Sequence, residues 1–381
     1  MTTNKNHNSP NVPNLRFPEF QGEWEELGLS ELLDFKNGLN PKLDKFGKGI
    51  KFISVMDILN NAVITYDCIK ASVDVTEKEL SDFSVEKGDI LFQRSSETLE
   101  DVGRANVYMD DKTAVFGGFV IRGKKKGEYD PQYFNYLLRS PFARKRIVPM
   151  GAGAQHFNIG QEGLSKVNLH FANIKEQKKI GKMFSLLDER IATQNKIIDK
   201  LQSLIKGIAQ NVAHNNKPNI SLSECLECSS STLQESDVCE NGTYPVYGAN
   251  GIVGYLDNYN TEKEAVYIIK DGSGVGTVSY VTGKCSATGT LNILQAKEGY
   301  SLQYLYYLLK VFNFEPYKTG MAIPHIYFKD YGKAKVFCPS YTEQLQYARL
   351  LYAIESKLSI EKNILTNLSL QKQYLLRQMF I

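Results

Sequence analysis

Apolar residues recur at heptad spacing in two long segments, one in the middle of the chain and one at its end. Two interleaved seams of this kind are the pattern of a coiled coil, so each segment is predicted to form one long helix. The first helix has as its predicted seams Phe184, Ile191, Ile198, Ile205 and Val212, with Ile180, Leu187, Gln194, Leu201 and Ile208. The second has Leu351, Leu358, Leu365, Lys372 and Met379, with Tyr347, Ile354, Glu361, Leu368 and Leu375.

The simplest partner for each long helix is the other helix of the same chain, in an antiparallel coiled coil. Gln194 and Glu361 interrupt corresponding seam positions, and we expect them to fix the register at some cost in stability. About 38 helical residues span roughly 57 Å at the rise of an α-helix, which is the length of a spacer.

The rest of the chain shows short apolar runs broken by turn residues, the pattern of β-rich domains. "KGDILFQRS" in the first half and "EAVYIIKDGSGVGTVSYVTG" in the second are examples. A short helix is predicted after each set of strands. Asp130 supplies an N-cap with proline at the next position in the first half, and Ser301 is the expected cap in the second.

The two halves repeat one another in the same order. "IKEQKKI" and "YTEQLQY" align at an offset of 167 residues, "QYFNYLLR" and "QYLYYLLK" at 171, and "LSELLD" and "LSECLE" at 193. We therefore predict an α+β protein with an internal pseudo-two-fold repeat. Its parts are β-rich domains at 15–172 and 214–340 and long spacer helices at 173–213 and 341–381.

Composition adds limits rather than a function. The net charge of +3 does not by itself indicate a nucleic-acid partner, although "RGKKKG" and "RSPFARKRI" concentrate positive charge locally. Six cysteines at irregular spacings are not a disulfide framework, no apolar run is long enough to span a membrane, and the polar N-terminal stretch predicts neither a signal peptide nor an anchor. We expect a cytoplasmic protein.

Two different domains on a rigid spacer suggest two recognition events at a fixed distance, for which DNA is the obvious ligand. At this level the sequence resembles a known family, on "VPNLRFPEFQGEWEE", "GDILFQRS", "GAGAQHFNIGQEGLSKVNLHFANIKEQKKI" and "YPVYGANGIVGY". These stretches and the duplicated order are similar to the specificity subunits of type I restriction-modification systems. The resemblance implies two target recognition domains, each reading one half of a bipartite double-stranded DNA site. It also implies helices that dock two methyltransferase subunits and, through them, the restriction and translocase subunits.

Candidate DNA contacts lie in polar segments next to predicted strands, where side chains suited to base edges or phosphates cluster. In the first copy they are Arg94, Ser95, Ser96 and Thr98, then Gln155, His156 and Asn158. In the second they are Tyr244, Tyr247 and Asn250, then Lys270, Asp271 and Ser273, and finally His325, Tyr327 and Lys329. Each segment also has an ordinary interpretation as a polar surface turn.

No catalytic motif accompanies these segments. The chain has no Walker A sequence and no Asn-Pro-Pro or Asp-Pro-Pro methyltransferase core. The glycine-rich "KDGSGVGTV" precedes a strand instead of a helix, so it is predicted to be a tight β turn. Cys225 and Cys228 replace apolar residues of the first copy, which favours buried thiols over a metal site.

We therefore expect a non-catalytic chain with no metal and no cofactor of its own, with S-adenosylmethionine, ATP and Mg in partner subunits. The alternatives are a coiled-coil scaffold that binds two proteins and an enzyme that binds a nucleotide at the glycine-rich turn.

Overall fold

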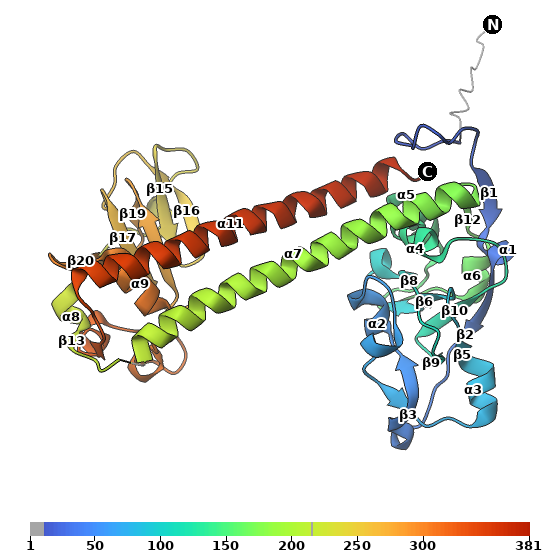
Figure 1. Ribbon diagram of the computed structural model, residues 1–381, viewed down its shortest axis with the longest axis horizontal. Helices are drawn as coiled ribbons and strands as arrows, with labels where there is room; N and C mark the ends of the chain where they lie inside the picture. Colours follow the sequence, from blue (N-terminus) through green and yellow to red (C-terminus); the bar gives the residue numbers. More distant parts are fainter. Residues whose placement is uncertain (1–10, 215) are drawn as a thin grey trace, which may run out of the picture. The chain divides into compact units, whose positions relative to one another are not determined.

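The computed structural model describes residues 11–214 and 216–381 (Figure 1). Most of the polar N-terminal stretch, and with it the expectation that no signal peptide or anchor is present, lies outside these residues. The chain divides into two compact units. Unit 1 extends to Gln194 and includes Ile364–Ile381, and unit 2 is Asn195–Asn363.

Unit 1 is built on two four-stranded sheets. The first has the order β2 (Leu33–Asn37), β10 (Val120–Lys125), β6 (Ile90–Gln93), β8 (Ala105–Val107), and the second β4 (Ser72–Val73), β3 (Phe46–Ile53), β9 (Ala114–Phe116), β5 (Ser84–Val85). Two short pairs are β1 (Glu25–Gly28) with β12 (Asn168–Phe171), and β7 (Ser95–Ser96) with β11 (Phe157–Asn158). The short helices are α1 (Leu29–Leu32), α2 (Val55–Asn60), α3 (Glu77–Phe83), α4 (Pro131–Arg139), α5 (Pro141–Ile147) and α6 (Gln161–Ser165).

Unit 2 repeats this plan with fewer elements. Its main sheet has the order β14 (Leu226–Ser230), β20 (Leu291–Ala296), β17 (Glu264–Ile269), β18 (Val278–Thr282), beside the three-stranded sheet β16 (Gly251–Leu256), β15 (Tyr244–Gly248), β19 (Ser286–Ala287). A short pair joins β13 (Ile220–Ser221) to β21 (Lys335–Val336), and the short helices are α8 (Leu222–Cys225), α9 (Leu302–Lys310) and α10 (Phe328–Tyr331). The described residues of unit 2 contain no counterpart of α2, α3 or α5, which agrees with the shorter second copy.

The long helices are α7 (Ile174–His214) and α11 (Tyr341–Gln378), and each belongs partly to both units. Within unit 1, Lys372 forms an ion pair with Asp188, while Phe380 just beyond α11 stacks on Phe184 with 5.8 Å between ring centroids. Residue numbers rise along one helix as they fall along the other, so the two run antiparallel there. Within unit 2, Gln202 and Ile205 line one hollow with Leu358, and Val212 lines the next with Tyr347 and Leu351, so the same antiparallel order holds there.

Burial confirms the predicted seams. Phe184, Ile198, Ile205 and Val212 are buried on α7, and Leu351 and Leu358 are buried on α11. Gln194 is also buried, while its predicted role with Glu361 in fixing the register stays a prediction. The fold class is thus confirmed as α+β, with a β-rich domain before each long helix.

A buried glutamine ties each β-rich domain to its long helix. In unit 1 the Gln177 side chain accepts a hydrogen bond from the Asp130 backbone N–H at 2.9 Å and donates to the Ala172 carbonyl at 2.8 Å. In unit 2 Gln344 accepts from the Ser301 N–H and donates to the Pro339 carbonyl, both at 2.9 Å. Buried backbone groups need such partners, so this glutamine fixes the angle between the short helix and the long one.

The caps predicted for the short helices are confirmed. The Asp130 side chain accepts from the Tyr133 N–H, and the Ser301 side chain accepts from the Tyr304 N–H. Trp24 is 3% exposed and packs edge-on against Tyr133. These contacts join the N-terminal segment, α4 and α7 into the hydrophobic core of unit 1.

Candidate nucleic-acid interface

The two candidate segments of the first copy meet at the end of strand β6. The chain leaves β6 at Gln93, and the next residues form β7, which pairs with β11: Ser95 lies opposite Asn158, and Ser96 opposite Phe157. We call residues 94–98 and 151–158 together loop pair 1. The structure therefore brings together side chains that are about sixty residues apart in the sequence.

Within loop pair 1, Arg94 is half-buried and its Nη1 donates to the Gly118 carbonyl at 3.3 Å. The Ser95 hydroxyl donates to Oδ1 of Asn158, and Ser96 Oγ accepts from the Thr98 N–H at 3.2 Å. Exposed side chains complete the surface of the pair: Thr98, Gln155, His156 and Asn158. Neutral amides and hydroxyls, one arginine and the exposed carboxylate of Glu97 make this surface suited to hydrogen bonding.

Unit 2 has an equivalent arrangement, loop pair 2, made of residues 270–273 and 319–327. Asp271 pairs with His325 in an antiparallel bridge, and His325 Nδ1 lies 2.7 Å from Asp271 Oδ1. An ionised carboxylate only accepts, so Nδ1 carries the proton and Nε2 is left for another partner. The half-buried Lys270 and the exposed Ser273 lie beside this bridge.

The backbones of the two loop pairs match bond for bond. Ile159 N–H donates to the Arg94 carbonyl, and Ile326 N–H donates to the Lys270 carbonyl, each at 2.9 Å. Bridges between residues 152 and 158 and between residues 319 and 325 close the two second loops at the repeat offset of 167. Arg94 is thus the structural counterpart of Lys270.

The turn in each second loop depends on glycine. Gly153 and Gly320 have positive φ angles of 145° and 89°. A Cβ atom would lie 2.0 Å from the carbonyl oxygen of residue 156 in the first loop and 2.3 Å from that of residue 323 in the second. Only glycine fits such a turn without a backbone shift, so both copies keep the same loop shape with different side chains around it.

The remaining predicted residues of unit 2 lie at the end of loop pair 2 or outside it. Tyr327 is exposed and lies under Lys329, whose Nζ is 5.2 Å from the ring centroid. Tyr247 packs on Tyr267 at the edge of a core cluster, and burial raises its pKa. Tyr244 contacts Tyr259, and Asn250 is exposed in the β15–β16 turn. Among the described residues, no hydrogen bond or ring contact joins Tyr244, Tyr247 or Asn250 to loop pair 2.

An exposed aromatic residue beside loop pair 1 was not predicted from the sequence. The Phe119 carbonyl accepts from the Arg94 N–H at 2.9 Å, and its ring is 68% exposed. It borders an apolar hollow of about 440 Å³ that Ser95 and Met56 also line. The signal in the sequence was a large apolar residue directly after Gly117-Gly118, at a turn where a polar residue is usual.

The glycine-rich segment of unit 2 is a turn between β17 and β18, as predicted, and it opens no helix. Cys225 is buried, and burial raises its pKa to about 12, whereas Cys228 is half-buried with a pKa raised to about 11 for the same reason. Within residues 11–214 and 216–381, no three His, Cys, Asp or Glu side chains are grouped to hold a metal ion. No helix in that part of the chain is both long and apolar enough to cross a membrane.

Comparison with known proteins gives relatives of one kind. A putative type I restriction enzyme specificity subunit of Methanocaldococcus jannaschii is 27% identical over 195 residues, which is 50% of this chain and 45% of the relative. A putative type I specificity subunit of Mycoplasma genitalium is 25% identical over 277 residues, or 66% of this chain and 71% of the relative. The first alignment thus spans less than half of that relative's length.

Solved structures show the same fold. The crystal structure of a type I restriction-modification S subunit from M. genitalium matches 97% of this chain and 99% of its own, with a TM-score of 0.66 and 19% identity. A chain from a structure on complex assembly of the type I R-M system covers 93% of this chain and 96% of its own, with a TM-score of 0.55 and 14% identity.

A family model, the type I restriction modification DNA specificity domain, matches residues 21–203 and again 219–370. The two matches cover most of the chain and correspond to the two halves of the internal repeat. The chain therefore belongs to the type I restriction-modification DNA specificity family.

Proposed function

We propose that this chain reads a bipartite double-stranded DNA site, with loop pair 1 contacting one half-site and loop pair 2 the other. The observation that carries the proposal is the pair of matched backbones with different side chains. An arginine, two serines and an asparagine in loop pair 1 correspond to a lysine and an Asp–His pair in loop pair 2. A common frame with different hydrogen-bonding groups suits two different short sequences.

The chemistry of individual positions supports this division. Arg94 suits guanine, because a guanidinium can bridge O6 and N7, and Asn158 suits adenine N6 and N7. Lys270 offers a point charge that suits a phosphate or a single acceptor, and His325 offers Nε2. The other predicted contacts, from Ser96, Thr98, Gln155 and His156 to Ser273, Tyr327 and Lys329, remain proposals of the same kind. Tyr244, Tyr247 and Asn250 have the least support of the set, because no described hydrogen bond or ring contact joins them to loop pair 2.

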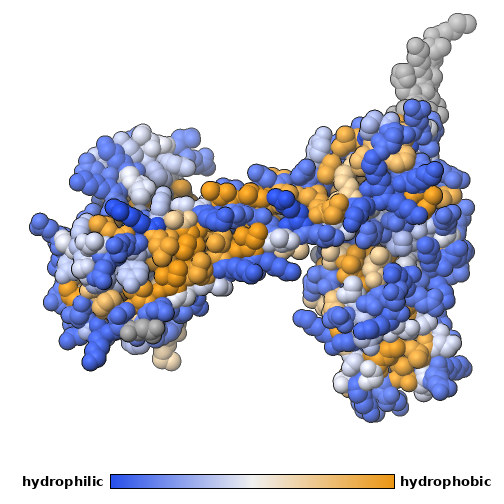
Figure 2. All heavy atoms as spheres, in the orientation of Figure 1, coloured by the Kyte–Doolittle hydropathy of each residue, from blue (hydrophilic) through white to orange (hydrophobic). Residues whose placement is uncertain are grey.

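The long helices, in this proposal, keep the two half-sites at a fixed spacing and bind partner subunits. Figure 2 shows apolar side chains gathered along α7 and α11 in unit 2, and the exposed large ones there include Leu204, Leu350, Tyr352 and Ile360. Exposed apolar patches of this kind mark protein interaction sites. We assign them to two methyltransferase subunits, with restriction and translocase subunits joining through these.

Catalysis is proposed to reside in the partners, in the cytoplasm, where S-adenosylmethionine, ATP and Mg would be bound. Within this chain the residues act by binding and by orienting DNA. The nucleotide-dependent enzyme is the least favoured alternative, since the glycine-rich segment leads into strand β18 and not into a helix whose N-terminus could hold phosphate.

The experiment is a footprint of the full chain with its methyltransferase subunit, on DNA whose site is taken from the methylated adenines of the host genome. We expect two protected tracts with a constant unprotected gap. One continuous tract, or no protection, would overturn the proposal. A scaffold that binds two proteins would show weak DNA affinity that depends little on sequence.

A further inference from the structure

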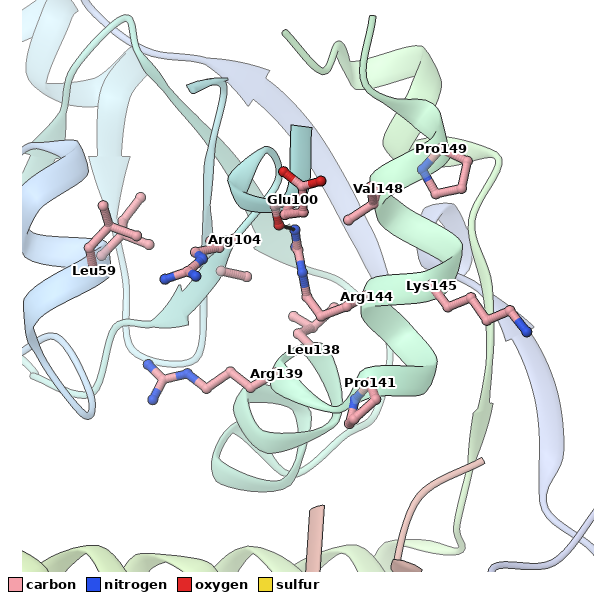
Figure 3. Close-up of a pocket in the computed structure, with 12 residues that line it drawn as sticks. Leu59, Glu100, Arg104, Leu138, Arg139, Pro141, Arg144, Lys145, Val148 and Pro149 are labelled. Atoms are coloured by element: carbon pink, nitrogen blue, oxygen red, sulfur yellow. Dashed lines mark hydrogen bonds between the residues drawn. The ribbon is translucent and has the colours of Figure 1, made fainter. Parts of the chain in front are cut away.

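A second candidate site lies in unit 1, outside loop pair 1. It is a cavity of about 810 Å³ bordered by α2, the start of β8 and the helices α4 and α5 (Figure 3). Three arginines line it: Arg104 before β8, Arg139 at the end of α4, and Arg144 on α5. Figure 3 shows Arg104 and Arg139 pointing into the same open space, whereas Lys145 points away from it.

Two of these arginines have no carboxylate partner among the described residues. Arg144 Nη2 donates to the carbonyls of Glu100 at 2.8 Å and Val102 at 2.6 Å, and its buried Nη1 has no hydrogen-bond partner in the described part of the chain. Arg139 Nη2 donates to the Asn61 carbonyl at 3.2 Å. Burial lowers the pKa of both arginines, that of Arg144 to about 10. Asp188 and Asp101 attract these arginines only from beyond ion-pair distance, so a bound anion in direct contact would stabilise the partly buried charges.

The anionic groups nearby are few. Glu100 is the carboxylate among the lining residues that the structure describes, and its backbone carbonyl, rather than its side chain, holds Arg144. Arg104 is paired with Asp101 at 2.5 Å but remains about half exposed. The cavity therefore keeps an excess of positive charge that faces solvent.

The cavity adjoins loop pair 1. Gln93, the last residue of β6, donates its N–H to the Arg104 carbonyl at 2.7 Å, and Arg94 of the loop pair follows directly. On the other side, Val148 and Pro149 line the cavity and lead into the loop that starts at residue 151. Two short backbone segments thus connect the cavity with loop pair 1.

The corresponding part of unit 2 is lined differently: a cavity of about 470 Å³ there is bordered by α7, α9 and α11, and no arginine is among the described residues that line it. The counterpart of Arg139 at the repeat offset of 171 is Lys310, which forms an ion pair with Glu355 at 3.0 Å. Helix α5, which carries Arg144, has no counterpart there. The arginine-lined cavity is thus a feature that the two copies do not share.

We infer that this cavity binds a phosphate group of the DNA backbone next to the half-site read by loop pair 1. The inference rests on the proposed function and adds a contact that would fix the position of the duplex in unit 1 alone. A guanidinium matches the geometry of a phosphate with two parallel donors, and phosphate contacts set register without reading sequence. A free phosphate or a nucleoside triphosphate offers the same chemistry, and the test separates these sources.

The test compares the full chain with Arg139→Gln and Arg104→Gln, using duplexes that carry or lack the two half-sites. Arg144 is left unchanged because it holds the carbonyls of Glu100 and Val102. Affinity is measured by fluorescence anisotropy over a salt series. Each variant should bind every duplex about fivefold more weakly, and its slope of log affinity against log salt should be shallower by about one for each phosphate that it no longer neutralises. Arg146→Gln is the control, since it also removes one positive charge but at a residue of α5 that does not line the cavity and pairs with Glu26.

The outcomes are distinct. If the wild-type chain binds no duplex, the proposed function fails and this inference with it. If the wild type binds and both variants keep its salt slope, only the cavity assignment is overturned. If inorganic phosphate or ATP raises the melting temperature of the wild type but not of Arg139→Gln, while the DNA slope is unchanged, the site takes a free anion and the backbone assignment is wrong. Thermal melting without ligand checks that each variant is folded.

Discussion

Loop pair 1 and loop pair 2 have the same backbone and different chemistry. In each, an isoleucine N–H donates to the carbonyl of a cationic residue, Arg94 in unit 1 or Lys270 in unit 2. In each, a turn at a glycine with positive φ closes the second loop. The side-chain pair at the centre differs completely, with a hydroxyl and an amide in unit 1 and a carboxylate and an imidazole in unit 2. The two copies therefore share the backbone hydrogen bonds that hold the loops in place and differ in the side chains at the centre of each loop pair.

The contacts between each short helix and its long helix show the opposite behaviour. Gln177 and Gln344 make corresponding hydrogen bonds in the two copies. A tyrosine of each short helix also donates to a carboxylate of the long helix at 2.8 Å, Tyr136 to Asp188 and Tyr307 to Glu355. These side chains set the geometry of each domain on its helix. The difference between fixed anchors and variable loops is what one expects when geometry must be constant and specificity must vary.

We call Gln177 and Gln344 the glutamine anchors, and removing them is expected to have the largest effect. Gln177→Ala and Gln344→Ala should each lower the free energy of unfolding by about 3 kcal/mol, because each leaves one buried and one half-buried backbone group without a partner. Urea denaturation of the full chain, followed by circular dichroism, measures the loss. Gln346→Ala, at an exposed position of the same helix α11, is the control and should change little.

The two glutamine anchors would not be equivalent if one substitution lowered the free energy of unfolding by about 3 kcal/mol and the other hardly changed it. Such a result would mean that one short helix is held by packing alone. Similar losses in both would support equivalent anchors.

A second prediction concerns the two cations of the loop pairs. Arg94→Ala should reduce discrimination at the first half-site by about 1 to 3 kcal/mol and leave the second unchanged, since a bidentate contact to guanine is worth that much. Lys270→Ala should act on the second half-site only and more weakly, because an ammonium group makes a less directional contact. Competition binding against duplexes with single base-pair changes in one half-site measures both.

Lys87→Ala is the control for these variants, since Lys87 is exposed near the start of β6 while Arg94 follows its other end. Loss of discrimination at both half-sites from either variant would contradict the assignment of one loop pair to one half-site.

The sequence was sufficient for the parts of the fold that local patterns determine. Heptad spacing predicted the long helices, and the caps at Asp130 and Ser301 predicted the starts of the short ones. The repeat offsets predicted that the two domains share a plan. Each of these signals lies within a few turns of chain or in direct repetition, so no tertiary information was needed.

The assembly of the candidate sites was beyond the sequence. That Ser95 pairs with Asn158 depends on how β6 and the loop after α5 come together, and no local pattern sets that register. The basic run from Arg139 to Ile147 was visible as charge, but whether its arginines face a cavity depends on the packing of α5 against the segment before β8. In "RGKKKG" the same kind of signal had a structural outcome, since Arg122 on β10 is buried and its guanidinium lies over the Phe116 ring, 5.4 Å from the centroid.

The smallest effect is expected at the carboxylates Asp188 and Glu355, which have different lysine partners. Asp188 receives its lysine, Lys372, from α11, whereas Glu355 receives Lys310 from the short helix α9. Burial alone would raise the pKa of Glu355, but hydrogen bonds from Tyr307 and Lys310 outweigh it and hold that pKa below its usual range.

A carboxylate with a lowered folded-state pKa stabilises the protein above its unfolded-state pKa and loses that contribution as the pH falls through the folded-state value. Glu355→Gln should therefore cost about 1 kcal/mol at neutral pH, and the difference from wild type should shrink as the pH falls below about 4. The midpoints of urea denaturation at neutral pH and at a pH below about 4 measure this difference, with the exposed Glu298→Gln as control. A cost that is the same at both pH values would mean that Glu355 contributes through the acceptor oxygen that Gln lacks, which Tyr307 and Lys310 use, and that the charge itself adds little at this position.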